Sequence, residues 1–344
     1  MIALQKTAAA FGVELRDVPS PDAPGEGEVI VAVDAACVCG SDLHIYEWTS
    51  GYGFMAGALP VTLGHEFAGR VAAVGSGVRG FREGLRVAVR PSVVCGRCAA
   101  CLRGDGEFCT GRKGIGVTRD GGFAARVRVP AANCIVVPDD VEAELAALAE
   151  PMTVSAEAVA TADVRSGDRV LVLGPGNIGQ GIALFARAAG AAEVVIAGKH
   201  DRARLECLAA MGFEHTVDAG DRPLGEALAP HLAHGKFDVV IEATGAPSVI
   251  GPALEALRKR GVLAICGIHA QPASVDLTRL VREHQQIRGS YRAPVETWPK
   301  VLAFLREHAA LARRMITHRL PLGRAIEGLE LARTRVASKV VIVP

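Results

Sequence analysis

The sequence has almost no net charge, few aromatic residues and no long apolar run. Lys and Arg total 38 against 37 for Asp and Glu, which gives a formal net charge of +1, and aromatic residues make up 4% of the chain. Because the cations form no basic stripe, we expect neither a nucleic-acid partner nor binding to an anionic membrane. No apolar run approaches the roughly 18–20 residues that a transmembrane helix needs. These features are typical of a globular protein.

Secretory features are also lacking. The first six residues do not begin a long apolar signal core. The chain has nine cysteines, an odd number, and those outside one cluster are dispersed along the sequence. Stable disulfides belong to oxidising compartments, so this pattern favours a reducing one. We therefore expect a cytoplasmic protein.

What the sequence does contain is a window of four cysteines with the spacing C-x2-C-x2-C-x7-C, namely Cys95, Cys98, Cys101 and Cys109. Four thiolates this close together can enclose one tetrahedral Zn²⁺ and leave no position open for chemistry. Two disulfides are the alternative, and they would need an oxidising compartment. The spacing predicts a structural zinc site that fastens a loop.

The pattern of expected strands changes along the chain. Short strands and glycine-rich turns, such as 29–33, 69–75 and 85–89, dominate the first part. From about residue 166, apolar strand runs alternate with helices, which predicts a parallel sheet covered on both faces. The expected strands there are 169–173, 193–197, 238–242, 262–266 and 286–288; the last fifty residues hold an expected helix, 298–307, and a final strand, 339–343.

A glycine-rich turn follows the first of the later strands. Residues 174–179 read G-x-G-x-x-G between a strand and a helix, which is the context that makes this motif specific for a dinucleotide. Glycines allow a tight turn and a close approach to pyrophosphate, and the helix N-terminus supplies free N–H groups. We expect a nicotinamide dinucleotide to be bound by Gly174, Gly176, Asn177, Ile178 and Gly179.

The choice between NAD and NADP depends on the end of the second strand. An acidic residue about 20 positions on normally binds the ribose 2′-OH, but this chain has Gly198 followed by Lys199 and His200. A missing carboxylate beside cations favours a 2′-phosphate, and hence NADP. Alternatively, the two basic residues are solvated loop residues, and Asp201 caps the next helix or binds the ribose.

Two further fragments carry metal-binding side chains. Cys37 and Cys39 lie at the end of a predicted strand, and His65 and Glu66 follow about 25 residues later. One thiolate, one imidazole and a carboxylate leave a tetrahedral zinc with an open position, as catalysis requires. Spacing alone does not choose between Cys37 and Cys39, since residues i and i+2 of a strand share a face.

Together these motifs resemble the zinc-dependent medium-chain alcohol and polyol dehydrogenases, over essentially the whole chain. The resemblance implies an α/β protein: a GroES-like β-rich catalytic domain, residues 1–155 completed by 293–344, and a Rossmann coenzyme domain with a doubly wound parallel sheet, residues 156–292. The matching segments are 39–44 (CGSDLH), 64–69 (GHEFAG), the four-cysteine window, Glu150-Pro151, 166–168 and 174–179.

The resemblance also implies the site residues. It selects Cys39 over Cys37 as a ligand of the catalytic zinc and makes His65 the second ligand. Glu66 is then a third ligand or lies close behind the ligands, and Glu150 binds the zinc directly or through water. Glutamate at position 150, where simple alcohol dehydrogenases have cysteine, resembles the sorbitol and threonine dehydrogenase branch. Two zinc ions per subunit are therefore expected, one catalytic and one structural.

The activity implied is hydride transfer between an alcohol carbon and NAD(P), with zinc stabilising the alkoxide. Ser41 and His44 match the family's proton relay, for which an imidazole with an ordinary pKa near 6.5 is suited. An ordinary turn contact is the alternative for both residues.

Two segments point to different substrates. Residues 44–48 resemble threonine dehydrogenase, whereas 287–292 and 297–299 resemble sorbitol dehydrogenase. In the sorbitol branch Arg292 would bind polyol hydroxyls or order the carboxylates around zinc; a surface ion pair is its alternative. We expect a secondary alcohol with neighbouring polar groups, a polyol or sugar alcohol first and an amino alcohol such as L-threonine second.

A non-catalytic zinc-containing dinucleotide-binding protein is the remaining alternative. Relatives of the resembled family are usually dimers or tetramers, so a homo-oligomer is expected from the resemblance alone.

Overall fold

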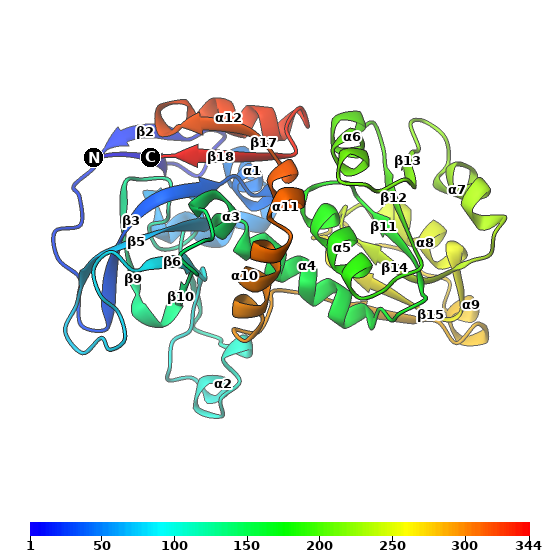
Figure 1. Cartoon of the computed structure of the whole chain (residues 1–344), viewed down its shortest axis with the longest axis horizontal. Helices are drawn as coiled ribbons and strands as arrows, with labels where there is room; N and C mark the ends of the chain where they lie inside the picture. Colours follow the sequence, from blue (N-terminus) through cyan, green and yellow to red (C-terminus); the bar gives the residue numbers. More distant parts are fainter. The chain divides into compact units, whose positions relative to one another are not determined.

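The computed structural model describes residues 1–344, with Ser50 described by its backbone alone. The chain forms two compact units, Met1–Glu150 together with Trp298–Pro344, and Pro151–Thr297. The boundaries predicted from the sequence, after residues 155 and 292, differ from these by five residues each. Figure 1 shows the C-terminal strands, in red, beside N-terminal strands, in blue, within the first unit.

The first unit is built on a seven-stranded sheet of order β10-β6-β5-β3-β18-β17, in which β9 also pairs with β3. Strand β3, Glu28–Cys37, is buried along most of its length because β5, Glu66–Val74, and β18, Lys339–Val343, both pair with it. The last strand of the chain therefore completes a sheet that begins near residue 28. The other strands are β6 Arg86–Val89, β9 Arg126–Pro130, β10 Cys134–Val136 and β17 Ile316–Pro321.

Smaller elements surround this sheet and pack against a core that includes Leu4, Val31, Phe67 and Ile342. A three-stranded sheet has the order β2-β1-β4, and a two-stranded sheet pairs β7 with β8. Their bounds are β1 Ile2–Lys6, β2 Glu14–Asp17, β4 Val61–Thr62, β7 Ser92–Val93 and β8 Lys113–Gly114. The helices are α1 Gly40–Glu47, η1 Ser50–Ala58, α2 Ala99–Leu102, η2 Gly106–Phe108, η3 Ala131–Asn133, α3 Ala143–Ala147, α10 Thr297–Glu307, α11 Ala309–Met315, η5 Leu322–Arg324 and α12 Ala325–Arg333. Helix α4, Ala149–Ala162, begins at the end of this unit and continues into the second.

The second unit contains a six-stranded parallel sheet of order β13-β12-β11-β14-β15-β16. Its strands have apolar runs because helices cover both faces, as in Val170–Leu173, which is fully buried. The strand order reverses between β11 and β14, which makes the carboxyl end of β11 the ligand-binding position of a doubly wound sheet. The bounds are β11 Arg169–Leu173, β12 Glu193–Gly198, β13 Thr216–Asp218, β14 Phe237–Glu242, β15 Leu257–Ile265 and β16 Gln286–Gly289, with helices α5 Asn177–Ala188, α6 Arg202–Ala210, α7 Leu224–Leu232, η4 Pro247–Val249, α8 Ile250–Ala256 and α9 Leu277–Arg282.

The predicted combination of a β-rich unit and a doubly wound parallel sheet is confirmed. Strand β15 begins at Leu257, earlier than predicted, because the exposed residues Arg258, Lys259 and Arg260 hide the strand pattern in the sequence. None of the described helices is long and apolar enough to span a membrane.

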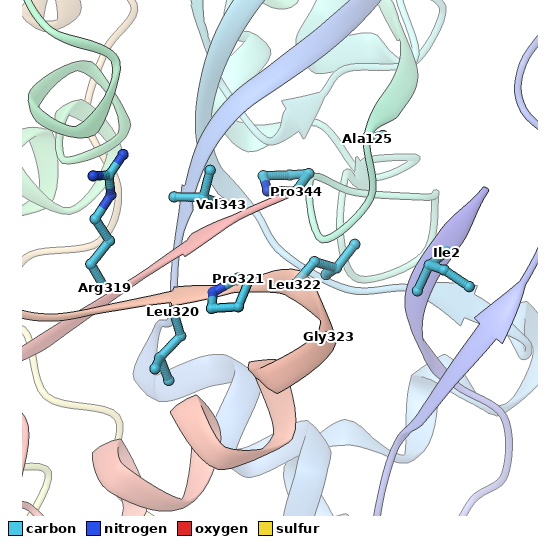
Figure 2. A pocket seen from close by; sticks show the side chains of 9 residues that line it. All are labelled: Ile2, Ala125, Arg319, Leu320, Pro321, Leu322, Gly323, Val343 and Pro344. Carbon is cyan, nitrogen blue, oxygen red and sulfur yellow. The ribbon is translucent and has the colours of Figure 1, made fainter.

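A pocket of about 620 Å³ lies beside β17 and β18, close to both ends of the chain (Figure 2). Its lining is mostly apolar and includes no cysteine, histidine or acidic side chain, so it lacks the groups that redox or metal chemistry requires. The lining residues are Ile2, Ala125, Arg319, Leu320, Pro321, Leu322, Gly323, Val343 and Pro344.

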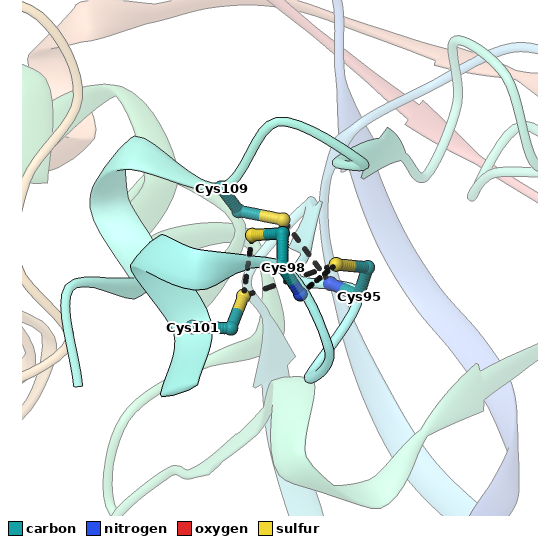
Figure 3. A group of neighbouring side chains, drawn as sticks. All are labelled: Cys95, Cys98, Cys101 and Cys109. Carbon is teal, nitrogen blue, oxygen red and sulfur yellow. Dashed lines mark hydrogen bonds between the residues drawn. The ribbon is translucent and has the colours of Figure 1, made fainter. Parts of the chain in front are cut away.

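The four-cysteine window forms a separate small lobe around α2 and η2. Its four sulfur atoms lie within 4.8 Å of one another (Figure 3). The Sγ atoms of Cys98 and Cys101 are 3.5 Å apart, and those of Cys95 and Cys101 are 4.0 Å apart. A zinc tetrahedron with bonds of about 2.3 Å has edges of about 3.8 Å, whereas a disulfide bond is about 2.05 Å long.

Backbone N–H groups further prepare this lobe for a cation. The N–H of Cys95 donates to Cys109 Sγ at 3.2 Å, and the N–H groups of Cys101 and Thr110 lower the pKa of Cys98 to about 5. A thiolate at neutral pH is the form that binds metal. The sulfur–sulfur separations fit a structural zinc and are longer than a disulfide bond, and none of the nine cysteines forms a disulfide in this structure. We propose that the four sulfurs bind one structural Zn²⁺.

Replacing Cys98 by alanine should release this zinc and destabilise the protein, because structural zinc contributes its binding free energy to folding. We expect the zinc content to fall by one per chain and the melting temperature to drop by about 5–10 °C. Cys134→Ala is the control, since this buried cysteine lies outside the lobe and its loss should leave the zinc content unchanged. Full zinc content and unchanged melting in Cys98→Ala would contradict the proposed role.

Candidate active site

Cys39 is positioned by the junction between β3 and α1. Strand β3 ends at Cys37, the chain turns, and Cys39 becomes the residue that precedes helix α1. The Asp42 carboxylate accepts a hydrogen bond from the Cys39 N–H at 2.9 Å, which is the return contact of a helix-capping arrangement. The two cysteines therefore do not share a strand face.

The fate of Cys37 follows from this turn. Its side chain is fully buried, and burial raises the pKa of its thiol. It lies opposite Glu66 in the β3–β5 register and remains in the sheet. The structure thus places Cys37 as a core thiol, whereas Cys39 stands beyond the strand end.

His65 and Glu66 are brought to the same place by the start of β5. Gly64 has φ +91°, and a Cβ there would lie 2.8 Å from Phe123, so glycine is required for this turn. The ligand atoms of Cys39, His65 and Glu66 all lie within 4.8 Å of one another. Residues separated by about 25 positions thus form one cluster, and His65 and Glu66 are both buried.

Electrostatics around His65 indicate a place for positive charge. Its Nδ1 lies 3.5 Å from Asp42 Oδ1, and its ring also interacts with Cys39, the neighbouring candidate ligand. Burial alone would lower the pKa of His65, but the negative charges of Cys39 and Asp42 outweigh it and raise this pKa well above the ordinary value. Sequence reasoning missed Asp42, although its position three residues after Cys39 is a capping signal.

Glu66 has an unexpected partner from the far end of the chain. Lys339, the first residue of β18, forms an ion pair with Glu66 Oε2, and its Nζ donates to the Val38 carbonyl at 3.0 Å. Burial alone would lower the pKa of Lys339, but the charges of Glu66, Cys37 and Cys39 raise it, so the ammonium stays charged. Nothing in the sequence near Lys339 suggests this role, because it reads as the start of a buried strand.

Glu150, at the start of α4, is not one of the three residues whose ligand atoms lie within 4.8 Å of one another, but the charges of His65 and Glu66 influence its pKa. Burial raises the pKa of Glu150 to about 7, with the charge of Glu66 adding to the rise and those of His65 and Lys339 opposing it. Burial, together with the Glu66 charge, likewise raises the pKa of Cys39.

A divalent cation fits this arrangement. Oε1 of Glu66 is buried and has no hydrogen-bond partner among the described side chains, whereas Oε2 is paired with Lys339. Uncompensated buried polar atoms are costly, and a metal ion would satisfy the carboxylate. Sulfur, imidazole and carboxylate are the donor set of a catalytic zinc.

The predicted relay residues lie beside the cluster, with a partner that the sequence did not reveal. Ser41 is half-buried and His44 is exposed, both on α1. Tyr52 hydrogen-bonds Ser41, and its ring stacks on that of His44 with centroids 5.9 Å apart. Tyr52 therefore connects Ser41, two positions after Cys39, with the exposed His44.

In the second unit, the glycine-rich turn has the required geometry. Gly174 directly follows β11 and has φ +106°, and a Cβ on Gly179 would lie 1.8 Å from the Gly174 carbonyl oxygen. Gly176, in contrast, has open space where a Cβ would point. Asn177, which begins α5, has two buried side-chain atoms without a hydrogen-bond partner among the described residues, and Ile178 accepts from Ser155 Oγ at 3.0 Å. The open space beside Gly176 and the unpartnered Nδ2 donor of Asn177 suit a bound pyrophosphate.

A second loop supports the turn and was missed in the sequence. Glu242, fully buried at the end of β14, accepts hydrogen bonds from the N–H groups of Thr244 and Gly245 at 2.5 and 2.8 Å. A Cβ on Gly174 would lie 3.0 Å from the Thr244 methyl group, so the two turns pack tightly. The sequence signal that could have revealed this loop is Glu242, an acidic residue at the end of an otherwise apolar strand.

The end of β12 contains no carboxylate, as the sequence indicates. A Cβ at Gly198 would lie 2.7 Å from Pro175, so a larger residue there would disturb the glycine-rich turn. Lys199 and His200 are exposed, and His200 Nε2 lies 3.0 Å from Asp221. Asp201 precedes α6 but makes no side-chain cap; it pairs with Arg204 at 3.3 Å, so the predicted capping role is wrong.

Arg292 belongs to the second unit, just after β16. It has φ +65°, and its guanidinium lies 4.4 Å from the centroid of the exposed Tyr291 ring. No carboxylate among the described residues forms an ion pair with it, which disfavours the surface ion-pair alternative.

Comparisons with known proteins agree with these two units. Residues 25–139 match the alcohol dehydrogenase GroES-like domain, and residues 177–307 match the zinc-binding dehydrogenase family. The chain is 33% identical over 343 residues to an L-threonine 3-dehydrogenase of Rhizobium etli, covering 99% of this chain and 98% of that protein.

Solved structures resemble the chain over its whole length. A protein described as a short chain alcohol dehydrogenase (rspB) from E. coli CFT073, complexed with NADH, has a TM-score of 0.89 and 30% identity. A zinc-binding dehydrogenase from Sinorhizobium meliloti 1021, bound to NADP, has a TM-score of 0.86 and 28% identity. Both alignments cover 100% of this chain and 99% of the other. Matched in both units and one third identical to a relative along nearly its full length, the chain belongs to the zinc-binding dehydrogenases with an alcohol dehydrogenase GroES-like domain.

Proposed function

We propose that this protein is a zinc-dependent NAD(P)-linked dehydrogenase of a secondary alcohol that carries a neighbouring polar group. The observation that carries the proposal is the cluster of half-buried Cys39 with buried His65 and Glu66, in which Oε1 of Glu66 has no hydrogen-bond partner among the described side chains. In a zinc-binding dehydrogenase this donor set supports a catalytic rather than a structural site, because three protein ligands leave one position open.

The residues have distinct roles in this proposal. Cys39 and His65 hold the metal, and Glu66 with Glu150 supplies the carboxylate, directly or through water. Zinc bound there supplies a Lewis acid for the alcohol oxygen, and a bound nicotinamide supplies the hydride acceptor. Asp42 orients the His65 ring, and Lys339 holds Glu66 and balances its charge.

The chain also offers a path for the released proton. Ser41 would accept the proton and shares a hydrogen bond with the Tyr52 phenol. His44 stacks on Tyr52 and is exposed, so its imidazole can exchange a proton with water. Gly174, Gly176 and Gly179 allow the pyrophosphate to approach, with Asn177 and Ile178 opening the helix beside it.

For the ribose we favour NADP. Gly198 contributes no carboxylate to repel a 2′-phosphate, Asp201 is paired with Arg204, and Lys199 supplies an exposed cation next to the strand end. The family includes members that bind either cofactor, as the two solved structures illustrate.

Two substrate classes have specific support. The resemblance of 287–292 and 297–299 to sorbitol dehydrogenase, with Arg292 free of any ion pair among the described residues, favours a polyol or sugar alcohol. The 33% identity to an L-threonine 3-dehydrogenase favours an amino alcohol as the second candidate. We also propose a homo-oligomer, a dimer or tetramer, which light scattering would test.

A substrate and cofactor panel tests the function. Protein with two zinc ions per chain should reduce NADP, and more slowly NAD, in the presence of sorbitol, xylitol or L-threonine, followed by reduced-nicotinamide absorbance. 2-Propanol, which has no neighbouring polar group, should be a poorer substrate. If no alcohol reacts although both zinc ions and the dinucleotide bind, the protein is a non-catalytic dinucleotide-binding member of the family.

Cys39 and Cys37 form a matched pair of variants. Cys39→Ser should release one zinc per chain and lower kcat/KM at least about 100-fold, because the ligand is lost while the sheet remains. Cys37→Ser should keep both zinc ions and most activity, at a modest cost in stability from a buried hydroxyl. Metal analysis and steady-state kinetics check this, and normal zinc content in Cys39→Ser would remove Cys39 from the site.

Gly176 and Gly179 separate cofactor binding from folding. A Cβ at Gly176 meets no protein atom, and its φ of −66° suits alanine, so Gly176→Ala should fold normally yet bind NADP at least about tenfold more weakly. Gly179→Ala should instead lower the melting temperature, because its Cβ would overlap the Gly174 carbonyl. Unchanged NADP affinity in a folded Gly176→Ala variant would place the dinucleotide elsewhere.

A further inference from the structure

A second group of possible metal ligands lies in the parallel-sheet unit, away from the glycine-rich turn. Glu193 begins β12, His215 directly precedes β13, and His231 lies in the last turn of α7. Because the strands are parallel, the amino ends of β12 and β13 meet at one edge of the sheet, whereas the glycine-rich turn follows the carboxyl end of β11. The group is therefore separate from the proposed dinucleotide site.

One carboxylate oxygen faces both imidazoles. Glu193 Oε1 lies 3.6 Å from His231 Nδ1 and 4.0 Å from His215 Nε2, and the three ligand atoms lie within 4.8 Å of one another. The two rings are nearly perpendicular, at 80°, with centroids 5.5 Å apart. For bonds of about 2.0–2.1 Å, the donor atoms around a tetrahedral zinc are about 3.3 Å apart, so the three ligand atoms would move closer together when the ion binds.

Arg169 holds this arrangement in place through the other carboxylate oxygen. Its Nε donates to Glu193 Oε2 at 2.6 Å, and its Nη2 donates to the His231 carbonyl at 2.9 Å. The guanidinium also packs over the Phe237 ring, 5.0 Å from its centroid. One residue thus fixes both the carboxylate and the backbone of a histidine, and leaves Oε1 to the imidazoles.

The backbone of the third residue is fixed as well. The His215 carbonyl accepts a hydrogen bond from the Ile196 N–H at 2.9 Å, which ties it to β12. The Glu193 side chain is 19% exposed and that of His231 is 19% exposed, whereas His215 is 47% exposed.

We propose that Glu193, His215 and His231 bind one borderline divalent cation, of which Zn²⁺ is the test case. Two imidazoles and one carboxylate suit zinc, copper or nickel better than calcium or magnesium. Three protein ligands leave an outer position for water on the exposed side, beside His215. The cation links the start of β12, the segment before β13 and the end of α7, so its binding stabilises this unit.

The positive charge of Arg169 and the exposure of His215 both weaken cation binding at this site. We therefore expect a dissociation constant for zinc in the micromolar range. Zinc at that concentration should raise the melting temperature of the protein, because a ligand that binds only the folded state stabilises it.

The experiment uses full-length protein without a histidine tag, loaded with two zinc ions per chain and freed of excess metal. Zn²⁺ is then titrated in competition with a chromophoric indicator, and melting is recorded with and without added zinc. We expect a third equivalent in the wild type. His215→Gln and His231→Gln should each weaken it at least about tenfold and abolish the zinc-dependent rise in melting temperature.

His234→Gln is the matched control, since this exposed histidine lies three residues beyond His231 and outside the ligand set. It should retain the third equivalent. Cys39→Ser, which lacks the proposed catalytic zinc, should still bind one added zinc beyond the structural one, and this separates the new site from the catalytic one. A wild type that binds only two zinc ions, or a third equivalent unchanged in both His215→Gln and His231→Gln, would overturn the proposal. Melting of each variant in the absence of added zinc verifies that it is folded.

Discussion

The buried ion pair between Glu66 and Lys339 is the constraint on which the first unit depends. A lone carboxylate or ammonium in a protein interior is strongly destabilising, and removing one partner of such a pair costs about 3–5 kcal/mol. Lys339 is the first residue of the last strand. Its ammonium contacts both Glu66 and the Val38 carbonyl, next to the end of β3, and so links the C-terminal strand to segments far away in the sequence. The strand end that precedes Cys39 is thus stabilised by the last strand of the chain.

Charge balance at this point supports the proposed cation site. Four acidic groups, Cys39, Asp42, Glu66 and Glu150, influence one another, while Lys339 and His65 are the bases that face them. The pKa of His65 is raised and that of Glu150 is raised to about 7. Both groups therefore bind protons more readily than usual, which offsets the excess of negative charge around them. A divalent metal satisfies the same electrostatic demand without protons, and the family to which the chain belongs uses zinc.

The second unit depends on close approach of backbone rather than on charge. Gly179 lies against the Gly174 carbonyl, Gly174 lies against Thr244, and Glu242 holds the Thr244–Gly245 turn. Among the three motif glycines of this turn, Gly176 alone has open space where a Cβ would point, and a ligand could approach the backbone there. Glu193 and its two histidines lie at the amino ends of the strands of the same sheet. The carboxyl ends therefore present backbone N–H groups, whereas the amino ends present imidazoles.

Sequence alone determined the features that depend on local spacing. The four-cysteine window, the G-x-G-x-x-G turn and the apolar strands of the parallel sheet are short-range patterns, because ligand spacing, turn geometry and strand burial are each encoded within a few residues. Resemblance to the family supplied the choice of Cys39 over Cys37; the structure adds the physical reason, which is that β3 ends between them. Tertiary structure decided the contacts between distant segments: Lys339 against Glu66, Tyr52 between Ser41 and His44, and the meeting of Glu193, His215 and His231. These pairings could not be read from the sequence, since strand order and loop return place residues together that no periodicity connects.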